Sequence, residues 1–169
     1  PLAEKVMSKL TDYDLSRIKF YWGTEEKVLG NKILFSRTGY TGEDGFELYF
    51  RPDLAEKIWE ATSEAGKELE IEPIGLGARN SLRLEMKYML YGNDIDQTTN
   101  PMEAGLSWLV KLDKGDFIGK EAILNAKQNP KRSFLAFEMV DKAFPRQHYE
   151  IRKNRAKIGE VTSGIFSPS

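Results

Sequence analysis

The chain has 169 residues, with 25 Lys and Arg against 26 Asp and Glu, so its formal net charge is −1. That balance gives no argument for binding nucleic acid or an anionic membrane. Cysteine is absent and His148 is the single histidine, which excludes disulfides, thiolate metal sites and a multi-histidine zinc site. No run of about 20 apolar residues is present, so the sequence predicts no transmembrane span.

Hydrophobic spacing in the first part of the chain predicts short helices and strands. Alternation places Ile33 and Phe35 on one face of a strand, and it places Phe46 and Leu48 opposite Glu47 in the next strand. The predicted elements are a helix over 2–10, strands over 18–22, 32–37 and 46–51, and a helix from Pro52 to Gly66 with Leu54, Ile58, Trp59 and Ala61 on its core stripe.

The second part of the chain begins with a helix and ends with strands. The pattern predicts a helix over 78–90, a strand over 106–112 and a helix over 117–127, and then strands around Phe134, Tyr149 and Ile158. We place a domain boundary at Asn129-Pro130, because the residue before proline disfavours helix. The predicted fold class is α+β: a mixed α/β domain over 1–130, followed by a truncated all-β, barrel-like domain over 131–169.

Two charged residues stand where local structure does not favour them. Glu47 interrupts an apolar string, and it is either a solvent-facing strand residue or a carboxylate that accepts parallel hydrogen bonds from a ligand. Arg79 lies in the first turn of a predicted helix, where the dipole disfavours a cation, and Arg83 follows one turn later. We expect an acidic partner for these arginines, either on a ligand or within the chain at Glu47, Glu72 or Glu85.

The segment from Thr38 to Gly45 contains glycines at 39, 42 and 45 around Tyr40. Asp44-Gly45 is a turn signal, but the connection is too long for a two-residue hairpin. The segment is either an ordinary long connection or a loop that lets backbone approach a ligand and presents the ring of Tyr40.

Other motifs carry less weight. Gly75–Asn80 matches only part of a dinucleotide-binding fingerprint, and we interpret it as a tight turn into a helix in preference to a nucleotide site. Asn93–Asp96 resembles the start of a calcium loop, but Thr99 and Gly105 occupy the positions that need Gly and Glu, so we reject an EF-hand. His148 has no evident acid–base partner in the sequence and is interpreted as a surface residue. Its basic surroundings, residues 131–158, are interpreted as a solvated face, with an acidic partner protein as the second interpretation.

Several longer strings occur in a fixed order along the whole chain. Residues 36–47 read SRTGYTGEDGFE and residues 75–85 read GLGARNSLRLE. The same order continues through Tyr91–Asp96, Asn100-Pro101, Gly105–Trp108 and Thr162–Gly164. Together these strings resemble the glycine cleavage system T protein family, the aminomethyltransferases.

The resemblance implies a folate-dependent enzyme. In this family an aminomethyl group arrives on the lipoyl arm of the H protein. Its methylene passes to tetrahydrofolate, the co-substrate, and ammonia leaves; no metal is implied. By resemblance, Glu47 and Arg79 fall on substrate-contacting positions, and Tyr40 falls on a residue lining the folate cavity. Arg79 could meet either pterin ring acceptors or the glutamate tail.

The chain also departs from the family pattern. It opens on Pro1 and resembles the middle of the longer protein, without the N-terminal part that supplies the family's aspartate. We therefore expect a fragment with no catalytic residue, inactive on its own. Its parent would act in the bacterial cytoplasm, or in the mitochondrial matrix if eukaryotic, with the lipoylated H protein as partner and neither nucleic acid nor a membrane.

Three rival interpretations remain. One is the folate-binding region of a dimethylglycine or sarcosine oxidase-type demethylase, which would carry a flavin domain upstream. Another is the non-enzymatic folate-binding paralogue linked to iron–sulfur cluster assembly, although that family has an essential cysteine that this chain lacks. A dinucleotide-dependent oxidoreductase rests only on the incomplete glycine pattern and ranks last.

Overall fold

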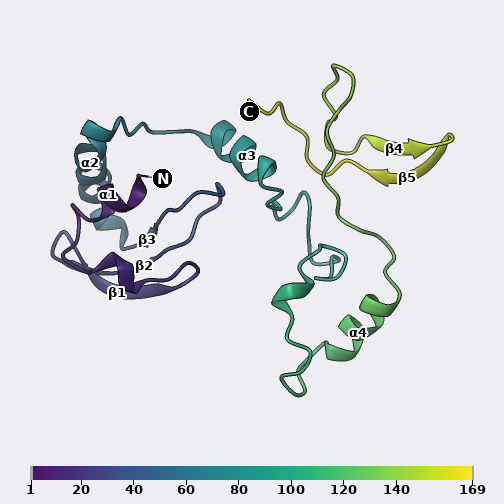
Figure 1. Cartoon of the computed structure of the whole chain (residues 1–169), viewed down its shortest axis with the longest axis horizontal. Helices are drawn as coiled ribbons and strands as arrows, with labels where there is room; N and C mark the ends of the chain where they lie inside the picture. The colour runs from purple at the N-terminus through teal and green to yellow at the C-terminus, as the bar shows by residue number, and fades with distance from the viewer. Residues whose placement is uncertain (1, 169) are drawn as a thin grey trace. The chain divides into compact units, whose positions relative to one another are not determined.

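The computed structural model describes residues 2–168, which form two compact units divided between Met86 and Lys87 (Figure 1). The mixed α/β character predicted from the sequence is confirmed. In chain order the elements are α1 (Ala3–Met7), η1 (Leu15–Arg17), β1 (Gly23–Val28), β2 (Asn31–Ser36), β3 (Glu47–Tyr49), η2 (Pro52–Leu54), α2 (Ala55–Gly66), η3 (Lys67–Leu69), α3 (Leu76–Glu85), η4 (Ser107–Leu109), α4 (Lys120–Gln128), β4 (Glu150–Lys153) and β5 (Ala156–Glu160).

The first unit is built on a three-stranded antiparallel sheet in the order β1-β2-β3. Leu29 and Gly30, both with positive φ, make the tight turn between β1 and β2, a backbone shape that matches the twist of paired strands. β2 and β3 are joined instead by the long 38–45 connection. Their register sets Ser36 opposite Glu47 and Phe35 opposite Leu48, so Glu47 and Leu48 point to opposite faces, as the alternation predicted.

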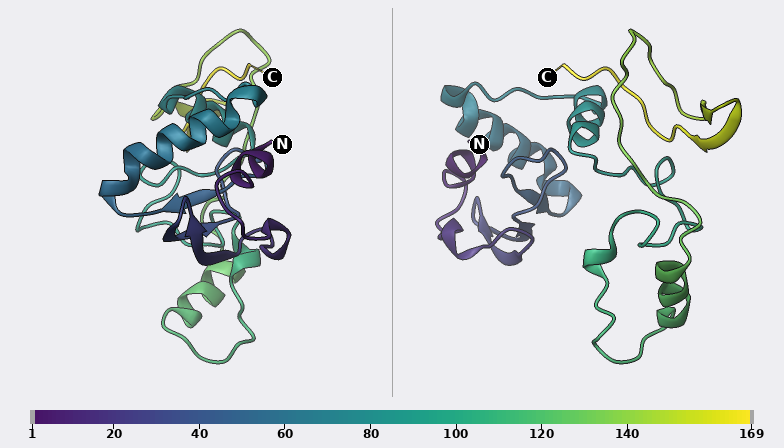
Figure 2. Two further views of the ribbon diagram at one scale, coloured as in Figure 1. Left: turned by 90° about the vertical axis from the view of Figure 1, so that its left-hand side faces the viewer. Right: turned by 45° about the vertical axis from the view of Figure 1, so that its right-hand side comes forward.

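One face of this sheet carries the hydrophobic core. Met7 of α1 and Ile58 of α2 are buried against Val28, Ile33 and Phe35. α1 and α2 cover the same side of the sheet (Figures 1 and 2). Burying aliphatic and aromatic side chains of this size stabilises the fold by about 1.5–3 kcal/mol each. The core therefore fixes the sheet that carries Glu47 on its opposite face.

Two predictions in the first unit are wrong in detail. Residues 18–22 form no strand: Tyr21 adopts a left-handed φ of 68° and the backbone N–H of Trp22 bonds to Lys19 O, which makes a turn. The strand lies later, in β1, where sequence analysis expected none. Trp59 was placed on the core stripe of α2, yet it is 61% exposed. It follows buried Ile58 by one residue, about 100° around the helix.

α3 begins earlier and ends earlier than the predicted helix over 78–90. It spans Leu76–Glu85, and Lys87 takes a left-handed φ of 58° that cannot continue a helix. The predicted strand over 106–112 is also wrong. The N–H groups of Leu109 and Val110 bond to the carbonyls three residues earlier, which makes the 3-10 turn η4.

The second unit contains α4, near the predicted helix over 117–127, and one hairpin. β4 and β5 pair antiparallel through Asn154 and Arg155, which both have positive φ. The predicted strands around Tyr149 and Ile158 correspond to this hairpin, but the one at Phe134 does not form: its N–H bonds to Glu103 O in a loop contact. The predicted boundary near residue 130, and the barrel-like domain after it, remain predictions. Across residues 2–168, no helix has both the length and the apolar character to span a membrane.

Candidate functional site

Arg37 holds the two ends of the 38–45 loop together. Its guanidinium donates two hydrogen bonds to the carboxylate of Asp44, from Nε and Nη2, at 2.7 Å each. Nη2 also donates to Glu4 of α1 at 2.5 Å, and Nη1 donates to the carbonyl of Leu15 at 3.3 Å. The guanidinium lies 5.4 Å from the ring centroid of Phe46. One arginine thereby joins both ends of the loop to the N-terminal helix.

The electrostatics of this contact favour the charged state of both groups. The hydrogen bonds from Arg37 hold the pKa of the Asp44 carboxyl below its ordinary value, against a smaller opposing effect of burial. Asp44 in turn raises the pKa of the Arg37 guanidinium. A bidentate arginine–carboxylate pair of this kind restricts geometry as well as supplying energy. The Arg37–Asp44 pair therefore holds the two ends of the 38–45 loop in a fixed position, which we call the base of the loop.

Glu47 is half-buried at the start of β3 and accepts a hydrogen bond through Oε2 from the hydroxyl of Thr38. That hydroxyl also contacts Ser36 Oγ at 2.7 Å. Ser36, Thr38 and Glu47 form what we call the hydroxyl chain. Ser36 lies directly opposite Glu47 in the sheet. The hydroxyl chain therefore runs from β2 to β3 on the face away from the core.

α3 places its first turn over the loop. The guanidinium of Arg79 lies 4.8 Å from the ring centroid of Tyr40, within range for a cation–π contact. At Gly42, where φ is +81°, a Cβ atom on the backbone would lie 2.5 Å from Cγ of Met86. A side chain at position 42 would therefore meet the end of α3, which explains the glycine there.

The structure thus brings Tyr40 and Arg79 into contact and puts Glu47 next to the loop that carries Tyr40. For Arg79, the partner among the described residues is an aromatic ring and not one of the expected carboxylates. Arg83 is 1% exposed, and its Nε donates to Asn80 Oδ1 at 2.8 Å. It is one of the largest fully buried side chains among the described residues.

Arg37, Thr38 and Ser36 were not predicted to be site residues, although all three lie in the string that resembles the family. The signal was a Ser and a Thr two residues apart at the end of a strand, with a glutamate on the next strand. This pattern alone could not show that the three side chains meet. That conclusion needs the strand register, which depends on the length of the intervening loop.

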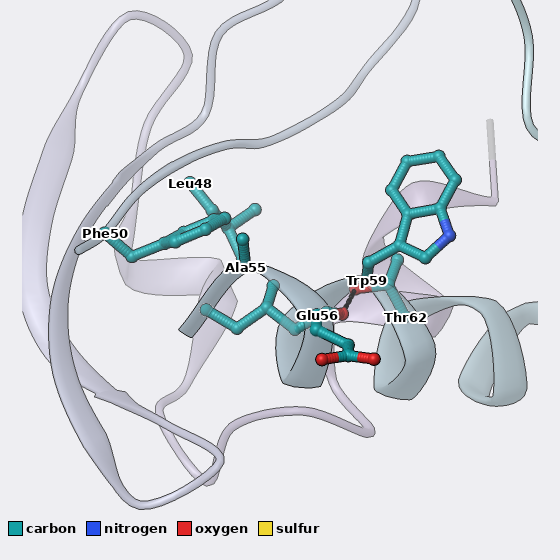
Figure 3. A pocket seen from close by; sticks show the side chains of 7 residues that line it. Leu48, Phe50, Ala55, Glu56, Trp59 and Thr62 are labelled. Carbon is teal, nitrogen blue, oxygen red and sulfur yellow. Dashed lines mark hydrogen bonds between the residues drawn. The ribbon is translucent and has the colours of Figure 1, made fainter. Parts of the chain in front are cut away.

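A cavity of about 510 Å³ lies elsewhere in this unit, beside α2 (Figure 3). Its lining is mostly apolar, and exposed Trp59 stands at one side of it. The complete lining is Leu48, Phe50, Ala55, Glu56, Ile58, Trp59 and Thr62. Tyr40, Glu47 and Arg79 are not part of it.

Two residues considered in the sequence lie in the second unit. His148 is exposed, as expected, but it does have an acidic partner: Nδ1 lies 2.9 Å from Glu160 Oε1. That contact lowers the pKa of Glu160, with Lys157 adding to the effect. Asp94 is 8% exposed and accepts hydrogen bonds from the N–H of Leu90 and the hydroxyl of Thr162. It thereby joins two of the strings that resemble the family, as a structural contact.

The side chains around the loop offer groups that can recognise a ligand. A carboxylate can accept hydrogen bonds from adjacent donors, an aromatic ring can stack, and a guanidinium can meet acceptors or a carboxylate. Within residues 2–168, His, Asp and Glu side chains do not gather in a group of three or more that could hold a metal ion.

Comparison with known proteins gives a consistent result. The family model described as the GCVT N-terminal domain matches residues 1–114. The chain is 50% identical over 171 residues to the aminomethyltransferase of Thermoanaerobacter sp. (strain X514), and 47% identical over 169 residues to that of Thermotoga petrophila. In both comparisons all of this chain is covered, but only 46% of the relative.

A solved structure agrees with the sequence relatives. It is the glycine cleavage system aminomethyltransferase T from Bartonella henselae, with a TM-score of 0.85 and 33% sequence identity. The match covers 96% of this chain and 45% of the other. The chain therefore spans about half the length of the relatives it matches.

Proposed function

Because the chain belongs to the aminomethyltransferase family of the glycine cleavage system, we propose that the protein containing it is a tetrahydrofolate-dependent aminomethyltransferase. It takes an aminomethyl group from the lipoyl arm of the H protein. The methylene passes to tetrahydrofolate, which becomes 5,10-methylenetetrahydrofolate, and ammonia is released. The relatives named above are bacterial, which supports a cytoplasmic reaction.

The observation that carries the proposal is the grouping of Tyr40, Glu47 and Arg79 around one loop and the adjoining strand. A pterin presents an amino group and a ring N–H side by side, and a carboxylate accepts such parallel donors. Glu47 would bind that edge, and the ring of Tyr40 would line the cavity. Arg79 would meet either the ring acceptors or the glutamate tail of the folate.

The described residues supply recognition, and we assign them no catalytic group. We infer that the family aspartate expected to act on the folate nitrogen lies in the part of the longer protein that this chain does not span. We therefore propose that the 169-residue chain is inactive alone. Detectable turnover by the purified chain, with lipoylated H protein and tetrahydrofolate, would contradict that.

We also propose that residues 131–169 begin a β domain that continues in the longer protein. The β4–β5 hairpin supports this, as do the exposed apolar side chains that precede it. Leu135 is 74% exposed, Phe137 is 51% exposed and Val140 is fully exposed. Exposed apolar side chains of this kind would be covered if the β domain continued in the longer protein.

The test is a calorimetric titration of the chain with 5-formyltetrahydrofolate, wild type beside Glu47→Gln. We expect saturable binding that the substitution weakens by about 1.5–3 kcal/mol, the range for a hydrogen bond to a charged group. The same change at Glu43, an exposed residue of the same loop, is the matched control. If the chain alone shows no saturable binding, the same titrations are made on the longer protein that contains it. Binding that is insensitive to Glu47→Gln, or no saturable binding by the longer protein, would contradict a folate site built on Glu47.

A further inference from the structure

We propose that Thr38 is a positioning residue that fixes the carboxylate of Glu47 for recognition of the pterin edge, and that Ser36 orients Thr38. The inference rests on the proposed function and deepens it. It identifies what makes one half-buried glutamate selective for adjacent nitrogen donors.

Counting protons gives the hydroxyl chain a single direction. An ionised carboxylate only accepts hydrogen bonds, so the one proton of the Thr38 hydroxyl is directed at Glu47 Oε2. Thr38 then has no proton for Ser36, and the 2.7 Å contact between the two hydroxyls requires Ser36 to donate. The order is Ser36 to Thr38 to Glu47, and each group holds the next in one orientation.

The backbone fixes the positions of the two residues at the ends of the hydroxyl chain. Ser36 and Glu47 are directly paired across β2 and β3, so their Cα positions are set by the sheet. The β-branched side chain of Thr38 has few rotamers, which limits where its hydroxyl can point. Glu47, in contrast, has a long side chain that loses much rotamer freedom when it is ordered. The hydrogen bond from Thr38 removes that freedom before a ligand arrives.

The hydrogen bond from Thr38 also makes the two carboxylate oxygens of Glu47 inequivalent. Oε2 is engaged by Thr38, whereas the described residues give Oε1 no hydrogen-bond donor. A ligand that offers two adjacent N–H groups can use Oε1 and the remaining lone pair of Oε2 without turning the carboxylate. A ligand with one donor gains less binding free energy from a carboxylate held in this plane. The hydrogen bond from Thr38 therefore contributes to selectivity as well as to affinity.

The expected effect follows from the cost of ordering one side chain on binding. Immobilising a flexible side chain costs an amount equivalent to about 2- to 12-fold in affinity. Thr38→Val keeps the size and branching of the side chain but removes the hydroxyl. It should therefore weaken binding of 5-formyltetrahydrofolate by about 2- to 12-fold, and Thr38→Ser should bind as the wild type does.

The decisive measurement compares two ligands by calorimetric titration: 5-formyltetrahydrofolate and its 2-desamino-2-methyl analogue, which lacks one donor of the pterin edge. Wild type should prefer the parent ligand by about 10-fold or more, the value of one hydrogen bond to a charged group. Thr38→Val should reduce that preference. The double variant Thr38→Val with Glu47→Gln should show the same preference as Glu47→Gln alone. Thr41→Val is the matched control, since the Thr41 hydroxyl accepts from Glu43 N–H and does not contact Glu47.

The outcomes separate this inference from the proposed function. If Glu47→Gln lowers the preference and Thr38→Val leaves it unchanged, the positioning role is wrong and the folate site stands. If neither substitution changes the preference, or if the longer protein that contains this chain binds neither ligand in the wild type, the folate site and the positioning role are both wrong. Equal losses in Thr38→Val and Thr41→Val would show a general effect on the loop and would also overturn the positioning role.

Discussion

Replacing Arg37 with Gln tests whether the loop that carries Tyr40 is held at its base. The Arg37 side chain is 18% exposed, and its partners Asp44 and Glu4 are 37% and 46% exposed. The substitution removes the bidentate pair with Asp44, the bond to Glu4 and the contact with the Phe46 ring. It leaves the carboxylates without their shared cation.

The size of the effect follows from this partial burial. Hydrogen bonds to charged groups contribute about 1.5–3 kcal/mol, while fully exposed ion pairs contribute at most about 1 kcal/mol. Arg37 combines a partly buried pair with a more exposed one, so we expect a loss of about 2–4 kcal/mol in the free energy of unfolding. Arg51→Gln is the matched control. Arg51 and its partner Asp53 are 83% and 60% exposed, so that loss should stay near 0.5 kcal/mol.

Urea unfolding monitored by tryptophan fluorescence measures both variants, and pH dependence adds a second check. The pKa of Asp44 is lowered in the folded chain, mainly by Arg37. The resulting stabilisation is present above the unfolded pKa of about 3.9 and is lost as pH falls through the folded value. The difference between wild type and Arg37→Gln should therefore narrow below about pH 4. Equal losses for Arg37→Gln and Arg51→Gln at neutral pH would refute the reasoning.

Two further predictions use other contacts. Gly42→Ala should lower the free energy of unfolding by about 1 kcal/mol more than Gly30→Ala: both glycines have φ near +80°, but only position 42 would also crowd Met86. Urea unfolding measures the free energy of unfolding of both glycine variants. Adding Met86→Ala to Gly42→Ala should restore the additional loss that the crowding causes. Equal losses of stability in Gly42→Ala and Gly30→Ala would contradict the crowding. His148→Ala should raise the pKa of Glu160 toward its ordinary value, because the bond from His148 is the main cause of its lowering. NMR titration of the Glu160 carboxyl measures this, and an unchanged midpoint would contradict the assignment.

Sequence pattern predicted the sheet core well and the irregular segments badly. Ile33 and Phe35 were placed on one face by alternation, and both are buried. The strand predicted over 18–22 was wrong because Tyr21 takes a left-handed conformation, which an apolar run does not reveal. The strand predicted over 106–112 failed for a related reason. An apolar run of that length also fits a 3-10 turn, and only a neighbouring strand could have decided between them.

For the candidate site, the sequence suggested residues but not their contacts. Glu47 and Arg79 were singled out because each conflicts with its local surroundings, and the structure gives each a partner that no local rule could supply. Glu47 meets Thr38 across a nine-residue separation, and Arg79 meets Tyr40 across thirty-nine. An acidic partner was expected for Arg79 because charge is visible in a sequence. An aromatic ring brought close by a loop is not.

The two charged groups of this site differ in how firmly they are held, which predicts how they divide recognition. Glu47 is fixed by a strand pair and by the hydroxyl of Thr38, so its geometry exists before a ligand arrives. Arg79 is exposed and rests on the Tyr40 ring through a contact with little directional demand. In the proposed folate site, a preformed carboxylate would suit the rigid edge of a pterin, while an adaptable guanidinium would suit the flexible glutamate tail. That difference favours the tail over the ring acceptors as the partner of Arg79. Comparing binding of 5-formyltetrahydrofolate with a pterin that lacks the tail, in wild type and Arg79→Gln, would decide between them.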